Sequence, residues 1–493
     1  MSRKRIAVVG AGIGGLSAAG RLAAAGHAVD LYEAQSFAGG KAGSEMIGDY
    51  RFDTGPSLLT MPFVFDDWFK ALGKRREDYV EFIPLSPITS YFFPDGTRLK
   101  SYSEREKLLD EIASATTEDP RNVARYLDHA ARVYTIAAKV FLFHSLHEWS
   151  TYRSLDFIRS LPGLPLIGGA STMDRINRKF FTDPRLVQLF NRYATYNGSN
   201  PYRTPGTMSL IPHVEYNLGA YGVGGGIYAL PQGMRKAAEE VGVRFHFNTA
   251  VDQILTQGRR INGIRIGGEK IAYDAVVSNA DVLTTYDKLL QRPEERNAMR
   301  YRKLEPSSSG IVFYWGVKRE FDELSLHNIL FSSDYPAEFA SIFEKGEVPE
   351  EPTVYINITS KLTREDAPSG GENWFILINA PAARGQDWER IVGETRERVE
   401  RIISTHLKLP VGELIEAEGS LNPPEIEART SSTYGSLYGI ASNSISSSFS
   451  RHRNRSRRYP GLYFVGGSAH PGGGMPLALL SGSIAADLIS KRS

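Results

Sequence analysis

The sequence of 493 residues contains no cysteine, and this absence removes several kinds of chemistry at once. The chain can form no disulfide, thiolate nucleophile, cysteine-ligated metal site or cysteinyl link to a cofactor. It also lacks any apolar run of the roughly 18 to 20 residues that a membrane span requires. Its formal net charge is only +2, so nothing global indicates a nucleic-acid partner. We therefore expect a globular chain of two or three domains, with at most a peripheral membrane contact.

A glycine-rich turn follows the first apolar segment of the chain. Four apolar residues without polar alternation, typical of a strand buried on both faces, precede Gly10, Gly12, Gly14 and Gly15. A small-residue helix and a second apolar segment ending at Glu33 complete a βαβ unit. Gly10 permits a tight turn, and Gly12 permits a close approach of the backbone to a pyrophosphate. Gly15 permits close packing of the helix on the strand, and Glu33 is placed to bind a ribose. The pattern predicts a dinucleotide site rather than a merely structural turn.

Two loops that follow are candidates for the same site. Gly39, Gly40 and Lys41 come one short loop after the acidic residue. Adjacent glycines allow a second close backbone approach, with Lys41 near a phosphate, although a merely flexible loop has the same composition. Further on, the segment Phe-Asp-Thr-Gly-Pro places Gly55 and Pro56 in a turn.

The region from residue 68 to residue 217 is predicted to be mostly helical and is rich in aromatic residues. Residues 133–144 carry apolar side chains at helical spacing, whereas residues 161–169 are apolar but interrupted by proline and glycine. These segments are either core helices with a loop, or an apolar lid that touches a membrane or lines a lipid tunnel. Asp156 and Arg159 are three residues apart and would share a helix face, as a surface pair or as a catalytic proton-handling pair.

A second glycine-rich stretch, residues 224–226, opens a helix that we expect to run to about Val241. Short strands are then predicted at 243–247, 250–255, 261–266, 271–273 and 275–277, separated in part by turn residues. This run closes on a Ser-Asn-Ala-Asp segment that contains Asn279 and Asp281. Strands at 311–317, 353–358 and 374–378 predict a second sheet.

The chain ends with a buried strand, a glycine loop and a helix. Gly467 and Ser468 follow the strand, and Gly474, Met475 and Pro476 introduce the helix, with the proline in its first turn. The loop also contains His470. Because its neighbours shape the backbone and include no acid–base partner, we expect this histidine to shape the loop rather than to act as a base.

Taken together, these segments resemble the amine oxidase/phytoene desaturase group of flavoproteins over essentially the whole chain. The C-terminal His-Pro-Gly-x-Gly-x-Pro motif is similar to that of bacterial carotenoid desaturases. The resemblance implies an α/β fold: a discontinuous Rossmann-type FAD-binding domain, a mixed β-sheet substrate domain and a helical, membrane-contacting lid. It assigns residues 1–75, 221–290 and 446–493 to the FAD domain, residues 76–220 to the lid and first part of the substrate domain, and residues 291–445 to the rest of that domain.

The resemblance also assigns contacts to FAD. They are Gly10, Gly12, Gly14, Gly15, Glu33, Gly40, Lys41, Gly55, Pro56, Asn279, Asp281, Gly467, Ser468, Gly474, Met475 and Pro476. Ser468 stands where related flavoproteins often carry an acidic residue, which makes amine oxidase chemistry less favoured. The positive N-terminal end of the last helix suits the negative charge that develops on a reduced isoalloxazine.

The reaction implied is removal of two hydrogens from a carotenoid end, a hydride to the flavin and a proton from the neighbouring carbon. The C-terminal motif resembles hydroxycarotenoid 3,4-desaturases more than four-step phytoene desaturases, so we expect 1-hydroxycarotenoid 3,4-desaturation. Phytoene desaturation, carotene isomerisation, flavin amine oxidation and flavin-free prenyl-lipid carriage remain alternatives. We further expect a cytoplasmic protein bound peripherally to the membrane, no metal, no nucleic acid, and oxygen or a quinone as electron acceptor.

Overall fold

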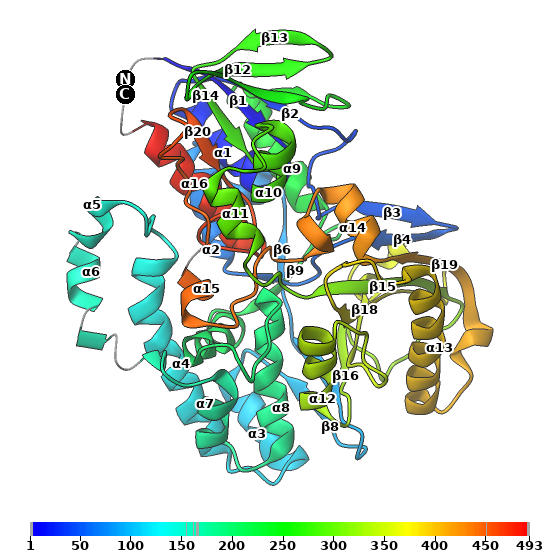
Figure 1. Cartoon of the computed structure of the whole chain (residues 1–493). Coiled ribbons are helices and arrows are strands. Elements are labelled where there is room, and N and C mark those ends of the chain that lie inside the picture. The colour runs from blue at the N-terminus through cyan, green and yellow to red at the C-terminus, as the bar shows by residue number, and fades with distance from the viewer. Residues whose placement is uncertain (1–2, 154, 161, 164–166, 450, 491–493) are drawn as a thin grey trace.

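The computed structural model describes the chain apart from residues 1–2, 154, 161, 164–166, 450 and 491–493, and apart from the side chains at 139–140, 150, 155–156 and 449. Figure 1 shows a layered α/β unit at the top, a unit built around a second sheet at the lower right, and helices at the lower left. Both termini lie beside the upper unit. The chain passes between these parts several times, so each is assembled from segments that are distant in sequence.

A five-stranded parallel sheet forms the centre of the upper unit, in the order β10–β2–β1–β14–β20. Its strands are β1 (Arg5–Val9), β2 (Ala28–Tyr32), β10 (Arg244–His246), β14 (Ala275–Ser278) and β20 (Leu462–Phe464). Strands β1, β14 and β20 are almost fully buried. This explains why apolar and polar residues do not alternate in their sequences. The discontinuous Rossmann-type architecture expected from the sequence is confirmed.

Helices from the two ends of the chain pack together on one face of this sheet. They are α1 (Ile13–Ala24) and α16 (Met475–Ser490), joined in one core by α2 (Pro62–Ala71) and α9 (Ala229–Glu240). At the crossing of α1 and α16, a Cβ added to Gly482 would lie 2.4 Å from the carbonyl oxygen of Gly14. The hydroxyl of Ser17 also donates a hydrogen bond to the carbonyl of Leu479, at 2.7 Å. The C-terminal helix therefore fixes the position of the helix that follows the first glycine turn.

The opposite face of the parallel sheet packs against a second core that includes a three-stranded antiparallel meander. The meander comprises β11 (Gln253–Gln257), β12 (Arg260–Ile266) and β13 (Glu269–Ala272), and the short helices α10 (Val282–Thr284) and α11 (Arg296–Arg302) lie beside it. The first meander strand begins at Gln253 rather than at the expected residue 250, because residues 247–252 form the crossing from β10 to the meander.

A mixed seven-stranded sheet, ordered β19–β15–β18–β17–β16–β7–β8, forms the second unit. Its strands are β7 (Thr89–Phe92), β8 (Arg98–Ser101), β15 (Ser309–Val317), β16 (His327–Leu330), β17 (Val354–Ile358), β18 (Glu372–Ala380) and β19 (Ile415–Leu421). Because side chains alternate along each strand, the sheet has two distinct faces. One face packs Trp315 and Trp374 against α13 (Trp388–Leu407), and the other packs Tyr314 and Phe375 in one core with Phe52, which lies on the segment connecting the two units.

Two small sheets connect the units. One pairs β3 (Ser44–Ile47) with β4 (Tyr50–Asp53), and the other has the order β5 (Leu59–Thr60), β9 (Ala220–Val223) and β6 (Phe82–Pro84). The expected Gly-Pro turn lies between β4 and β5. Since β4 contacts β18, this turn is held at the junction of the two units.

Helices account for most of the remaining chain. They are α3 (Arg105–Ala115), α4 (Pro120–Phe141), α5 (Trp149–Tyr152), α6 (Leu155–Ser160), α7 (Met173–Phe180), α8 (Pro184–Asn191), α12 (Tyr335–Ala340), α14 (Pro423–Thr430) and α15 (Ile445–Phe449). α4 begins with Asp119 as N-cap and Pro120 in its first turn, the usual start chemistry. α5 and α6 project at the left edge of Figure 1. None of the helices in the described part of the chain has the length and apolar character needed to cross a membrane.

The region expected to be mostly helical also contains strands. Besides β6, the hairpin β7–β8 extends the seven-stranded sheet, with β7 pairing in parallel with β16. The turn of this hairpin contains Asp95 and Gly96, and Gly96 has φ +86°, a conformation that glycine adopts without strain. Asp-Gly between two apolar segments is a hairpin signal that the helical interpretation overlooked.

Candidate functional site

The first glycine turn closes around the side chain of Asn279. Cβ atoms added to Gly12 and Gly14 would lie only 2.7 Å from Nδ2 and Oδ1 of Asn279, respectively. A Cβ on Gly15 would lie 2.0 Å from the carbonyl oxygen of Gly10, whose own φ is +96°. These positions therefore accept no side chain, and the turn presents backbone to whatever binds there.

The N-terminus of α1 points its free N–H groups into this turn. Its N-cap is Gly12, which has no side chain to cap the helix, so the first-turn amides are open to an anion. Glu33, at the end of β2, lies beside them and is only partly buried. Its carboxylate accepts hydrogen bonds from the backbone N–H of Ala11 at 2.6 Å and of Gln35 at 3.0 Å. This arrangement is compatible with a diphosphate beside an acceptor for sugar hydroxyls, and the contact of Glu33 with a ribose stays a prediction.

The next two loops lie against the first turn, as expected for a shared site. Gly39 bridges to Gly12, and a Cβ on Gly40 would lie 3.2 Å from the Cα of Gly12. A Cβ on Gly55 would lie 1.9 Å from the carbonyl oxygen of Lys41, so the Gly-Pro turn packs directly on the Gly-Gly-Lys loop. Gly40, Lys41, Gly55 and Pro56 are thus brought to the same edge of the parallel sheet.

Lys41 and Asp281 are partly buried groups of opposite charge that attract each other within this site. The ammonium of Lys41 donates to the backbone carbonyls of Ser436 at 3.1 Å and Leu437 at 2.8 Å. Burial lowers the pKa of Lys41 to about 8, against the opposing attraction of Asp281. Burial also raises the pKa of Asp281, whose carboxylate accepts a hydrogen bond from Thr433 Oγ1 at 2.7 Å. The pair fixes the segment 433–437 against the cofactor loops.

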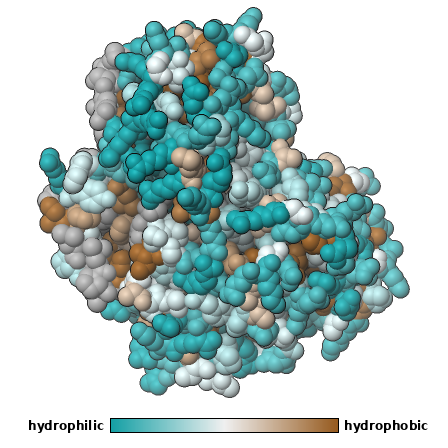
Figure 2. All heavy atoms as spheres, in the orientation of Figure 1, coloured by the Kyte–Doolittle hydropathy of each residue, from teal (hydrophilic) through white to brown (hydrophobic). Residues whose placement is uncertain are grey.

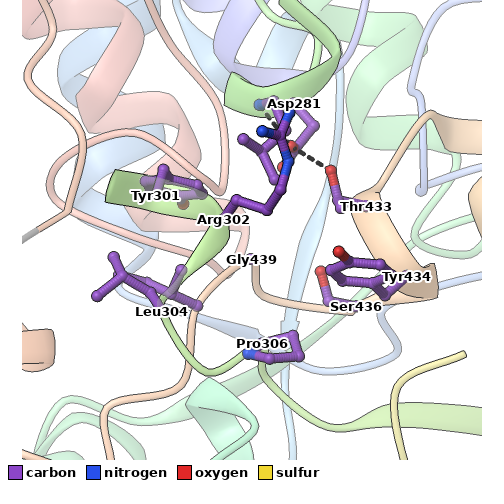
Figure 3. A pocket seen from close by; sticks show the side chains of 11 residues that line it. Asp281, Tyr301, Arg302, Leu304, Pro306, Thr433, Tyr434, Ser436 and Gly439 are labelled. Atoms are coloured by element: carbon purple, nitrogen blue, oxygen red, sulfur yellow. Dashed lines mark hydrogen bonds between the residues drawn. The ribbon is translucent and has the colours of Figure 1, made fainter. Parts of the chain in front are cut away.

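A small cavity adjoins Asp281. Asp281, Tyr301, Pro306 and Ser436 contribute to its lining, and Figure 3 shows Asp281 hydrogen-bonded to Thr433 at its edge. Its volume of about 20 Å³ admits roughly one water molecule. The cavity is too small to hold an extended ligand.

The C-terminal loop approaches from the other side. Ser468 Oγ accepts a hydrogen bond from the backbone N–H of Val282 at 3.1 Å, so it lies next to Asp281. Gly467 packs near Gly473, and Gly474, Met475 and Pro476 lead into α16. The predicted cofactor contacts in this C-terminal loop therefore lie opposite the predicted contacts that follow β14, Asn279 and Asp281. That each of them contacts the cofactor remains a prediction.

Arg451 is a residue of this site that the sequence did not reveal. It is only 4% exposed, and its guanidinium donates to the carbonyls of Tyr438 at 2.6 Å and Gly467 at 3.5 Å. No carboxylate lies within 4 Å of it among the described residues. Residues 451–458 form a basic run, which predicts a solvated surface, so composition gave no signal for this buried cation.

An aromatic row crosses the face of the seven-stranded sheet that is turned toward these loops. Tyr314 of β15, Phe375 of β18, Tyr355 of β17 and His327 of β16 follow one another, with ring centroids 5.8, 6.5 and 6.1 Å apart. Tyr355 is hydrogen-bonded through its hydroxyl to Ser57, directly after the Gly-Pro turn, at 2.5 Å. The row therefore forms a wall that begins at the candidate cofactor loops.

A buried ionic cluster lies on the same face of this sheet. Arg192 donates to Glu215 at 3.4 Å and to the hydroxyl of Tyr91 at 2.8 Å, and its guanidinium lies 4.4 Å from the ring centroid of Tyr193. Glu215 is fully buried and also accepts hydrogen bonds from the hydroxyls of Tyr193 and Tyr196. These residues come from separate helices and from β7, and no spacing in the sequence connects them.

The candidate catalytic pair lies apart from these residues. Both positions fall on α6, at the left edge of Figure 1. Arg159 is exposed, and the side chain of Asp156 lies outside the described residues. Their catalytic role stays a prediction.

A family model for flavin-containing amine oxidoreductases matches residues 13–490. The chain belongs to this family. It is 42% identical to a 1-hydroxycarotenoid 3,4-desaturase of Flavobacterium sp. (strain P99-3), over 99% of each chain. It is 33% identical to a 4,4'-diaponeurosporene oxygenase of Staphylococcus aureus (strain MRSA252), over 99% of this chain and 98% of that one. An oxidoreductase from Methanosarcina mazei shares the fold, with a TM-score of 0.64 and 15% identity over 97% of this chain and 99% of that one.

The resemblance to carotenoid desaturases is thereby confirmed, and this member of the family is an FAD-dependent oxidoreductase. Its residues fit the cofactor: the glycine turn admits no side chains and presents backbone, the α1 N-terminus offers amides, and Glu33 offers an acceptor. The Gly-Pro turn and the N-terminal end of α16 would hold the isoalloxazine between the two units.

Proposed function

We propose that this flavoprotein desaturates the end of an acyclic hydroxycarotenoid, between carbons 3 and 4 of a chain hydroxylated at carbon 1. The observation that carries the proposal is the 42% identity, over 99% of both chains, to a 1-hydroxycarotenoid 3,4-desaturase. Identity to the 4,4'-diaponeurosporene oxygenase is lower, at 33%, which favours desaturation over oxygenation.

The chemistry asks little of acid–base side chains. Bound FAD supplies the acceptor for a hydride, and the neighbouring carbon of the substrate loses a proton. The protein has to align the polyene beside the cofactor and exclude water. The buried aromatic row that starts at Tyr314 and ends at His327 supports this role, because it offers an apolar wall next to the loops that fit the flavin.

Two helices of the predicted lid, α5 and α6, support access of the substrate from a membrane surface. Trp149 and Tyr152 on α5 and Ile158 on α6 are 73%, 42% and 52% exposed, which is unusual for such large apolar side chains. Figure 2 shows hydrophobic atoms on the lobe at the left, where Figure 1 places these two helices. We propose that this lobe lies against the membrane in which the carotenoid is dissolved.

The test is an assay of FAD-loaded protein with carotenoids in liposomes. Two acyclic carotenoids of equal length, with and without a terminal tertiary hydroxyl, are supplied separately, and absorption spectra of the products are recorded. We expect a red-shifted product, one double bond longer in conjugation, from the hydroxylated chain only. The Gly15→Ala variant, in which the new Cβ would clash with Gly10, serves as the control without flavin.

Three results would contradict the proposal. Conversion of colourless phytoene would indicate a multi-step phytoene desaturase. Hydrogen peroxide release from amines would indicate an amine oxidase. Binding of isoprenoid by a protein that takes up no flavin would indicate a carrier.

A further inference from the structure

His327, at the end of the aromatic row, holds a hydrogen-bond donor for which the described protein supplies no acceptor. It is 1% exposed, and its Nε2 atom is buried without a partner among the described residues. Its other ring nitrogen, Nδ1, lies 3.2 Å from the amide nitrogen of Asn357 and 2.7 Å from the hydroxyl of Tyr355. The same Asn357 nitrogen also donates to the carbonyl of Leu326 at 3.0 Å. The Asn357 atom next to Nδ1 is therefore the amide nitrogen, which donates, and not the amide oxygen. Nδ1 therefore accepts.

The protonation state of the ring follows from its surroundings. Burial, together with the nearby charge of Arg192, lowers the pKa of His327 to about 3, so the imidazole is neutral at physiological pH. A neutral ring whose Nδ1 accepts carries its single proton on Nε2. The protein thus buries an N–H group that points at no acceptor, and leaving a donor in this state is costly.

A second unpartnered donor belongs to the same cluster. Nε of Arg192 is also buried without a partner among the residues that the structure describes. Tyr91, to which Arg192 donates, pairs with Ile329, and Ile329 pairs with Tyr355 in the next strand. Paired residues share a face of a sheet, so Arg192 and His327 approach the same side. One oxygen atom has two lone pairs and can accept from two such donors.

We propose that His327 binds the oxygen at the hydroxylated end of the substrate, with Arg192 as the second donor. The inference rests on the proposed function and names the residue that selects the substrate. Position supports it: the Tyr355 hydroxyl joins His327 to Ser57, which follows the Gly-Pro turn at the cofactor loops. In a 1-hydroxy-3,4-desaturation the oxygen-bearing carbon is only two bonds from the first reacting carbon, so the oxygen site has to lie close to the cofactor.

Tyr314, at the other end of the row, provides a matched control. Its hydroxyl is likewise buried without a partner among the described residues. However, its ring is packed between Phe52 and Phe375, at centroid distances of 5.4 and 5.8 Å, at the far end of the row from His327. Tyr314→Phe removes this hydroxyl without changing the shape of the wall.

The experiment measures binding rather than turnover. FAD-loaded protein in detergent micelles is titrated with the hydroxylated and the plain acyclic carotenoid, and quenching of tryptophan fluorescence gives the two dissociation constants. We expect wild type to bind the hydroxylated chain at least about tenfold more tightly. His327→Gln keeps an amide donor near the position of Nε2 and should retain most of this preference. His327→Asn, equally polar but too short to reach, should bring the ratio of the two constants close to one.

The plain chain should bind all variants alike, and Tyr314→Phe should keep the full preference. Equal binding of both chains by wild type, or an undiminished ratio in His327→Asn, would overturn the inference, as would loss of the ratio in Tyr314→Phe. A wild-type protein that binds the hydroxylated chain selectively but desaturates neither chain would overturn the proposed function while supporting the role of His327.

Discussion

The two halves of the site are built from different materials. At the cofactor end the binding surface is backbone, and side chains are excluded: a Cβ at Gly12, Gly14 or Gly15 would lie within 2.7 Å of another atom. At the substrate end the surface consists of large side chains, such as Tyr355 and His327, from neighbouring strands. The comparison teaches that the predicted diphosphate site is built by leaving side chains out, whereas the proposed polyene site is built by bringing large side chains together.

The largest effect should come from adding a single carbon to the cofactor half. In Gly15→Ala the new Cβ would lie 2.0 Å from the carbonyl oxygen of Gly10, so the turn has to open and the α1 N-terminus loses its alignment. We expect purified protein with less than about a tenth of the wild-type flavin, measured as the ratio of absorbance at flavin and protein wavelengths.

Gly393→Ala is the matched control for that substitution. Gly393 is exposed within α13, and an added Cβ would meet nothing within 4 Å. The Gly393→Ala protein should retain full flavin. Its unfolding free energy should rise by about 0.5–1 kcal/mol, as expected for glycine replaced by alanine in a helix. Full flavin in Gly15→Ala would mean that the turn does not set cofactor binding.

The corresponding change in the substrate half should affect folding instead of flavin. Glu215→Gln leaves Arg192 buried beside tyrosines without its counter-charge. We expect a loss of about 3–5 kcal/mol in unfolding free energy, measured by urea denaturation, with normal flavin content in the folded protein. The exposed pair Arg390–Glu394 is the control, since Glu394→Gln should cost less than about 0.5 kcal/mol. Equal losses in both variants would show that Glu215 and Arg192 are not a buried pair.

The difference between the halves also explains what the sequence could predict. The glycine turn could be recognised because a backbone-lined site leaves its signature in consecutive residues, and the structure places Asn279 against it. That these residues, Glu33 and Asp281 contact the cofactor stays a prediction. The strands of the second sheet were predicted for the same reason, since buried strands are local patterns, whereas the discontinuity of the α/β fold was implied by the family resemblance.

The substrate half was not predictable in this way. Tyr355 is hydrogen-bonded to Ser57, 298 residues away in the sequence, and to His327, 28 residues away, and each residue taken alone resembles ordinary core. Arg451 was hidden in a basic run that composition assigns to the surface. The hairpin β7–β8 was overlooked because helical patterns dominate its neighbourhood.

The pH dependence of the unfolding free energy tests the burial of Lys41, which lies where the cofactor and substrate halves meet. Burial holds the pKa of Lys41 at about 8, below the 10.5 of an exposed lysine. Between these two values the unfolded chain binds more protons than the folded one, so the unfolding free energy should rise with pH. Relative to Lys41→Met, wild type should gain on the order of 3 kcal/mol between pH 7.5 and pH 10.5, measured by urea denaturation. Parallel curves for the two proteins would show that the ammonium is not buried.

The smallest effect should come from the predicted lid, where several large side chains face solvent. Trp149 is 73% exposed on α5, and transfer of its ring into a bilayer interface would favour membrane binding. We expect Trp149→Ser to weaken binding to phospholipid vesicles about tenfold in a sedimentation assay, with flavin content unchanged. Met46, 61% exposed on β3 at the opposite side of Figure 1, is the control. If Met46→Ser weakened binding as much, the protein would meet the membrane through apolar surface in general, and the lid would have no role in taking up the substrate.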